Sequence, residues 1–216
     1  MITALEALER LREGNRRFLL GAGGLDTRVS QTRRREFADG QEPFAVVLGC
    51  SDSRVPVEIV FDQWLGDLFV IRVAGNVVAS SQIGSVEFAA ERFGTRLVVV
   101  LGHTRCGAVQ ATLEELQRPS ESRSRNLSSI VDRIRPSLEG LLATNLQHDP
   151  QALAHNAVRA NVRASVNQLR HGSQILERLI QTDGLGVVGA EYSLETGGVE
   201  FFDVVESTTE RSRDDR

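Results

Sequence analysis

Short apolar runs without alternation mark the first half of the chain as a series of strand-sized pieces. Polar or turn residues bound each run, and the runs cover residues 44–49, 68–73 and 97–102. Continuous β-branched stretches of this length are typical of strands buried on both faces of a sheet. Segments of helical length separate them, at residues 57–63, 82–93 and 107–117. This alternation predicts an α/β fold with a mostly parallel central β-sheet flanked by helices.

The first forty residues have a helical pattern instead. Apolar side chains fall near helical spacing, with Glu and Arg between them, at Leu5, Leu8, Leu11 and Phe18. A glycine-rich stretch at residues 21–24 then ends the helix, and a second short helix is expected over residues 31–38. We therefore expect residues 1–40 to form an N-terminal helical arm.

The second half begins with a Ser- and Arg-rich stretch, residues 118–126, that is expected to be a surface loop. Helices are then predicted over residues 127–142, 150–169 and 173–181. Two further strands are predicted over residues 186–192 and 199–205, joined by a Glu-Thr-Gly-Gly turn typical of a hairpin. The last strand should therefore run antiparallel, ahead of a polar tail at residues 207–216. No repeat or boundary divides residues 1–216, so a single domain is expected.

Composition excludes several classes of protein. The 216 residues are 41% hydrophobic and 25% charged, which indicates one soluble globular domain. A net charge of −4 lacks the basic footprint of a nucleic-acid binder. The longest apolar runs are far shorter than a membrane span, and the charged N-terminus lacks the apolar segment of a signal peptide. We expect a cytoplasmic protein without a membrane or nucleic-acid partner.

Two strand ends share one pattern that points to a metal. The run VVLG is followed by Cys50 in one strand and by His103 in another, and Cys106 lies three residues after His103. Ligand sites in open parallel sheets form beyond the carboxyl ends of the strands, so these side chains should meet. The chain has no third cysteine. A closed site of three or four cysteines from a single chain is therefore impossible, and the pattern favours a catalytic metal site with one open position.

Asp52 and Arg54 follow the first cysteine. Residues two apart in an extended segment point the same way, so this Asp and Arg can form a bidentate pair next to the metal. Such a pair would hold a carboxylate acceptor beside the open position. Taken alone, two buried cysteines and a core histidine would be ordinary in an α/β protein. Ordinary core packing does not easily explain why these three residues follow apolar strands and occur together with the Asp-x-Arg pair.

The two segments Cys50–Arg54 and His103–Cys106 resemble the C-x-D-x-R and H-x-x-C signatures of β-class carbonic anhydrases. The similarity extends to the N-terminal helix and to the segment GDLFVIRVAGN at residues 66–76. The resemblance implies a Zn²⁺ enzyme that interconverts CO2 and bicarbonate. Because two thiolates would offset the charge of the zinc and make its water less acidic, we expect activity to rise on the alkaline side of neutrality. It implies zinc ligands at Cys50, His103 and Cys106, and a catalytic dyad of Asp52 and Arg54. Asp52 is also a conditional fourth ligand.

The resemblance also implies a substrate pocket of the plant type. Its positions match Gln41, Phe69, Ala74 and Phe88, where the last replaces a tyrosine of the family and so removes one hydroxyl. Core packing is the alternative role for the two phenylalanines. Members with a bicarbonate-binding regulatory pocket carry a tryptophan where this chain has Val47, so no such pocket is expected.

The family pattern further implies a homodimer or a higher homo-oligomer, with the arm crossing to the partner.

Two alternatives to CO2 hydration stay open. The first is a CS2 or COS hydrolase on the same scaffold, which would use the same zinc site. The second is a catalytically silent zinc-binding regulatory module, which would need a broken dyad or a missing ligand. The sequence shows neither defect.

Overall fold

The computed structural model describes residues 2–22, 38, 40–119 and 124–202. The helix expected over residues 31–38 lies almost wholly outside these ranges. The polar tail, and the end of the last predicted strand, lie outside them as well. Within the described part of the chain, no helix is both long and apolar enough to cross a bilayer.

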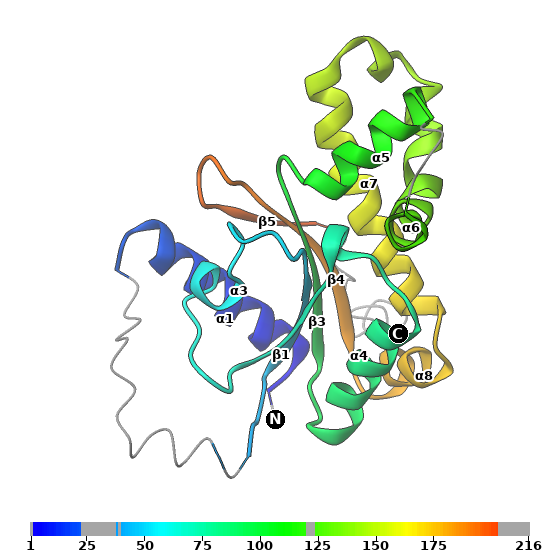
Figure 1. Ribbon diagram of the computed structural model, residues 1–216. Coiled ribbons are helices and arrows are strands. Elements are labelled where there is room, and N and C mark those ends of the chain that lie inside the picture. The colour runs from blue at the N-terminus through cyan, green and yellow to red at the C-terminus, as the bar shows by residue number, and fades with distance from the viewer. Residues whose placement is uncertain (1, 23–37, 39, 120–123, 203–216) are drawn as a thin grey trace, which may run out of the picture.

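A five-stranded sheet forms the centre of the fold, as the sequence predicts (Figure 1). Its order is β2-β1-β3-β4-β5. The first four of these are mutually parallel and β5 is antiparallel to β4. The strands are β1 (Ala45–Gly49), β2 (Leu68–Arg72), β3 (Leu97–His103), β4 (Gly186–Tyr192) and β5 (Val199–Phe202). Every residue of β1 and β3 is buried, which explains why their sequences are apolar without alternation.

Helices cover both faces of the sheet (Figure 1). One face packs against α1 (Ala4–Leu19) and the single turn α3 (Val57–Val60). The other face packs against α4 (Ser80–Arg92), α7 (Pro150–His171) and α8 (Gln174–Thr182). Beyond the carboxyl edge of the strands, α5 (Gly107–Gln117) and α6 (Arg125–Leu142) form a helical lobe with the first half of α7.

Three local features differ from the predicted pattern. The helix expected over residues 57–63 is only one turn long, because Asp62 turns the chain with a φ of 45°. Two short 3-10 turns, η1 (Ala74–Asn76) and η2 (Asn145–His148), were not predicted. The stretch expected to be a loop over residues 118–126 already enters α6 at Arg125.

The N-terminal helix packs against its own chain. Its start is closed by a capping box between Thr3 and Glu6. Near its end, the buried Asn15 donates to the backbone oxygens of Val60 and Gly197 and accepts from the backbone N–H of Val199. These bonds tie α1 to α3 and to the turn before β5, so one face of the predicted arm belongs to the core of this subunit.

Candidate metal centre

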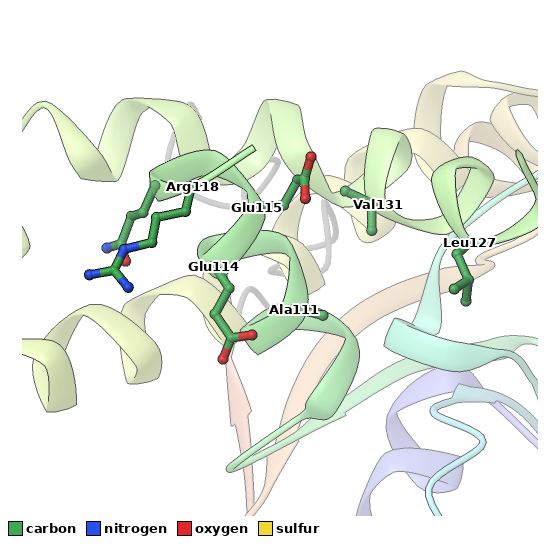
Figure 2. A pocket seen from close by; sticks show the side chains of 7 residues that line it. Ala111, Glu114, Glu115, Arg118, Leu127 and Val131 are labelled. Carbon is green, nitrogen blue, oxygen red and sulfur yellow. The ribbon is translucent and has the colours of Figure 1, made fainter. Parts of the chain in front are cut away.

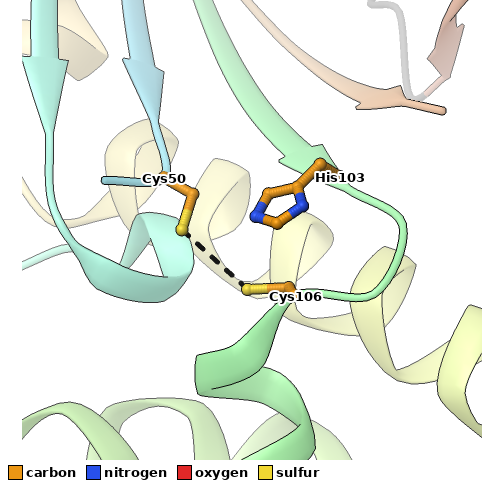
Figure 3. Close-up of side chains that lie close together, drawn as sticks. All are labelled: Cys50, His103 and Cys106. Atoms are coloured by element: carbon orange, nitrogen blue, oxygen red, sulfur yellow. Dashed lines mark hydrogen bonds between the residues drawn. The ribbon is translucent and has the colours of Figure 1, made fainter. Parts of the chain in front are cut away.

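Three side chains meet at the carboxyl edge of the sheet (Figure 3). Two of them, Cys50 and His103, lie at the ends of different strands and are 53 residues apart in the sequence. Cys50 directly follows β1, His103 ends β3, and Cys106 is the N-cap residue of α5. Because β1 and β3 are parallel neighbours, their carboxyl ends lie side by side. Arg105, in a left-handed conformation with a φ of 56°, turns the chain so that Cys106 comes back toward His103.

The spacing of the three donor atoms fits a tetrahedral metal. The donor atoms all lie within 4.8 Å of one another, and the two cysteine Sγ atoms are 4.0 Å apart. Zinc bound tetrahedrally at about 2.3 Å from each sulfur would hold the two sulfurs about 3.8 Å apart. Both cysteines are free thiols and are buried. Among the described residues, no other group of His, Cys, Asp or Glu side chains has this geometry.

The imidazole of His103 is oriented for the same purpose. Its Nδ1 lies 2.9 Å from the carbonyl oxygen of Thr104, which can only accept a hydrogen bond. The proton therefore sits on Nδ1, and Nε2 carries the free lone pair. Nε2 is buried and has no hydrogen-bond partner. A buried acceptor without a hydrogen-bond partner, close to two cysteine sulfurs, fits the role of a metal ligand.

The two sulfurs differ electrostatically. Their contact lowers the pKa of the Cys50 thiol to about 4 and raises the pKa of Cys106. The backbone N–H of Gly75, at 3.4 Å from the Cys50 sulfur, also favours the Cys50 thiolate. One thiolate is thus stabilised by the protein itself, which suits binding of a cation.

Asp52 and Arg54 form the bidentate pair that the sequence predicts. Arg54 Nε donates to Asp52 Oδ1 at 2.9 Å, and Arg54 Nη2 donates to Oδ2 at 2.7 Å. The Arg54 guanidinium holds the pKa of the Asp52 carboxyl well below its usual range, so this side chain is a carboxylate. Asp52 Oδ2 is 3.8 Å from His103 Nε2. The carboxylate therefore lies beside the three metal-ligating atoms.

A second arginine supports this segment from β2. Arg72 Nε donates to the carbonyl oxygen of Cys50 at 3.1 Å, and Arg72 Nη2 donates to the carbonyl oxygen of Asp52 at 2.6 Å. Sequence reasoning attached no role to Arg72. Its place at the end of the strand next to β1, pairing with Gly49, was the available signal.

The four residues expected to bind substrate lie in different settings, and Ala74 directly precedes Gly75, whose backbone N–H lies 3.4 Å from the Cys50 sulfur. Phe69 and Phe88 form an aromatic cluster with Phe93, and their ring centroids are 5.5 to 6.3 Å apart. Phe69 packs with the core on the α4 side of the sheet, whereas Cys50 and Cys106 belong to a separate apolar cluster with α5 and α6. The side chain of Phe88 is 53% exposed. Gln41 is exposed and Ala74, in η1, is half-buried.

Two hollows border the helical lobe. A hollow of about 570 Å³ between α5 and α6 is lined by residues such as Glu114, Arg118 and Leu127, and none of the metal-ligating side chains borders it (Figure 2). Another hollow, of about 700 Å³, lies between α5, α7 and the turn after β4. It contains Glu191, whose carboxyl group is buried and whose pKa is raised by that burial.

The fold and the site define an α/β protein with a candidate Cys-His-Cys metal centre at the carboxyl edge of its sheet. The family model described as carbonic anhydrase matches residues 45–199. The chain belongs to the β class of the carbonic anhydrase family, and it is a carbonic anhydrase.

Relatives resemble the chain over most of its length. A carbonic anhydrase of Mycolicibacterium smegmatis is 40% identical over 196 residues, which are 90% of this chain and 91% of that protein. Carbonic anhydrase 2 of Mycobacterium tuberculosis is 37% identical over 191 residues, which are 88% of this chain and 89% of that protein. Among solved structures, the β-carbonic anhydrase CafA of Aspergillus fumigatus is 27% identical with a TM-score of 0.69, and 93% of this chain and 91% of that chain are covered.

Proposed function

We propose that the chain catalyses the reversible hydration of CO2 to bicarbonate and a proton, with Zn²⁺ held by Cys50, His103 and Cys106. The observation that carries the proposal is the cluster of three buried donor atoms within 4.8 Å of one another. Three protein ligands leave one tetrahedral position open, as in catalytic zinc sites. When bound, zinc acts as a Lewis acid that makes hydroxide available from water near neutral pH.

The residues beside the metal supply orientation. Asp52 is ionised and its Oδ2 lies 3.8 Å from His103 Nε2, so it can accept a hydrogen bond from the attacking nucleophile. Arg54 occupies both carboxylate oxygens through a bidentate contact and keeps the carboxylate in place. The same proximity supports Asp52 as an alternative fourth zinc ligand. Water and this carboxylate would then compete for the open position.

The thiolate ligands set the direction of the pH dependence. Two thiolates offset the formal double positive charge of zinc, so water in the open position should be less acidic than in a site of three histidines. Activity is therefore expected to rise on the alkaline side of neutrality. A hydration rate that stays flat from mildly acidic to mildly alkaline pH would contradict this account.

The substrate pocket is proposed to be completed by a second subunit. Gln41, Phe69, Ala74 and Phe88 remain the candidate pocket residues, and a mostly apolar wall suits the small, uncharged CO2. Within one chain Phe69 and Phe88 pack away from the cysteine cluster, and Phe88 is half exposed. A homodimer that brings these side chains to the partner's metal centre would explain both facts. Light scattering of the zinc-loaded protein tests this part of the proposal, and a monomer would refute it.

The central experiment combines zinc content with stopped-flow CO2 hydration on the same preparation. We expect one zinc per chain and a hydration rate that scales with zinc content. A parallel CS2 assay separates CO2 hydration from hydrolysis of CS2 on the same scaffold. Full zinc content with neither activity would instead indicate a silent zinc-binding module.

The cytoplasmic location expected from the sequence is a further part of the proposal, which fractionation of the cells can test.

A further inference from the structure

The metal ligand Cys50 is contacted by a three-residue turn that lies next to it in space but 25 residues away in sequence. The backbone N–H of Gly75, in η1, donates to Cys50 Sγ at 3.4 Å. Both atoms are buried. A hydrogen bond from a backbone N–H offsets part of the negative charge on a thiolate and fixes the direction of the sulfur.

The helical lobe packs around this turn. Gly75 and Asn76 both have positive φ angles, of 68° and 44°. Glycine and asparagine are the residue types that adopt this conformation most readily, so the sequence suits the turn. The helical lobe closes over the turn. A Cβ added at Gly75 would lie 2.7 Å from Ile134 Cδ1 of α6 and 3.0 Å from Ala108 Cβ of α5.

Two buried side chains of α7 donate hydrogen bonds to this turn. Asn161 Nδ2 donates to the carbonyl oxygen of Gly75 at 2.8 Å, and Ser165 Oγ donates to the carbonyl oxygen of Asn76 at 3.0 Å. They are four residues apart, so they lie on the same face of the helix. Their exposed fractions are only 2% and 4%. Each therefore satisfies a backbone acceptor that water does not reach.

Both backbone polar groups of Gly75 are thus occupied, one by the metal ligand and one by α7. Its N–H faces the Cys50 sulfur and its carbonyl oxygen accepts from Asn161. We propose that Asn161 is a positioning residue for the metal centre, which fixes the N–H of Gly75 on Cys50 Sγ by holding the carbonyl of the same residue. The proposal rests on the metal site argued above. Asn161 acts through Gly75 rather than on the metal.

Ser165 offers a matched control. Its bond is also buried and also ends on the turn, but on the carbonyl of Asn76, whereas the N–H that reaches the sulfur belongs to Gly75. Losing either bond leaves one buried carbonyl oxygen without a donor, at a cost of about 1–3 kcal/mol of stability. The two variants should therefore be destabilised to similar extents. Only the loss at Asn161 should change the metal centre.

The experiment compares wild type, Asn161→Leu and Ser165→Ala as full-length, metal-stripped proteins. Zinc affinity is measured by competition with a chromophoric chelator, and Co²⁺ binding by the thiolate-to-cobalt charge-transfer band. Asn161→Leu should bind zinc about 10- to 100-fold more weakly, the range known for groups that orient metal ligands, and its cobalt band should shift. Ser165→Ala should keep both properties close to those of wild type.

Each result has a distinct meaning. Wild-type zinc affinity and an unshifted cobalt band in Asn161→Leu would overturn the proposal. An equal loss in both variants would overturn it too, because it would reflect general packing of the turn. If Asn161→Leu does not fold, Asn161→Ala, which removes the amide donor without adding a charge, replaces it and is judged by the same two readouts. Failure of the wild type to bind either metal would refute the proposed function instead.

Discussion

Gly102 lies in β3 where the sheet packs directly against α7, so it allows a quantitative test of the packing. It directly precedes His103 in β3. A Cβ built at Gly102 would lie 2.5 Å from Val162 Cγ2 and 3.2 Å from Val158 Cγ1, both on α7. Valine side chains in helices are confined to one rotamer, so neither methyl group can rotate away cheaply. Either the helix or the strand must shift.

The expected cost follows from this overlap. Overpacking a well-packed core by one methyl group costs about 1–3 kcal/mol. For a protein of this size, each kcal/mol lowers the melting temperature by about 2–4 °C. Gly102→Ala should therefore melt about 2–12 °C below wild type. Gly140→Ala is the matched control, because Gly140 lies inside α6 and a Cβ there meets nothing within 4 Å. It should gain about 0.5–1 kcal/mol, since alanine favours the helix.

The assay is thermal unfolding followed by circular dichroism, in matched zinc excess. A double variant, Gly102→Ala with Val162→Ala, removes the nearest clashing methyl group. It should be more stable than the sum of the two single changes predicts, because the two sites share one contact. A Gly102→Ala protein as stable as wild type would refute the reasoning. Simple additivity in the double variant would refute it equally.

Three further predictions concern the site and its surroundings. Cys106→Ser should lose zinc and CO2 hydration together, because serine lacks a thiolate at neutral pH; zinc content near one per chain by atomic absorption would contradict this. Asp52→Ala should keep zinc but lose at least about 10²-fold in hydration rate, the scale of one oriented hydrogen-bonding group, and a stopped-flow rate near wild type would count against the role of the dyad. Burial raises the pKa of Glu191 above its ordinary value of 4.5, against the weaker opposing effects of His155 at 3.7 Å and Arg159 at 3.9 Å. The native state therefore holds this proton to higher pH than the unfolded state, so Glu191 lowers stability as pH rises above that value. Glu191→Gln removes the effect, and urea unfolding should show its stability rising relative to wild type between acidic and neutral pH; parallel curves would disprove the effect.

Much of the metal centre was predictable because its ligands are tied to local sequence patterns. Cys50 and His103 follow the same apolar run, and parallel strands bring their carboxyl ends to one edge. The three-residue step from His103 to Cys106 is short enough for one turn of the chain. The Asp52–Arg54 pair needed only the alternation of side chains in an extended segment. Each of these is a short-range relation that one stretch of sequence can express.

The contacts that support the site could not be predicted from the sequence, because they join segments that are far apart in the chain. Nothing around Asn161 indicates that its amide will meet Gly75, which is 86 residues away in sequence. The one-turn length of α3 and the two left-handed residues of η1 are likewise set by what packs against them. Phe69 and Phe88 show the same limit, since a phenylalanine pattern does not distinguish a pocket wall from a core.

The sequence by itself therefore determined the class of fold, the order of the strands along the chain and the three side chains that meet in the candidate metal centre. Those features depend on hydrophobic periodicity and on residues placed directly at strand ends. Only the tertiary structure decided the orientation of His103 Nε2, the hydrogen bond on the Cys50 sulfur and the closure of α5, α6 and α7 over η1. These depend on atoms from four or more segments, whose relative positions are settled by packing of the whole core rather than by any local pattern.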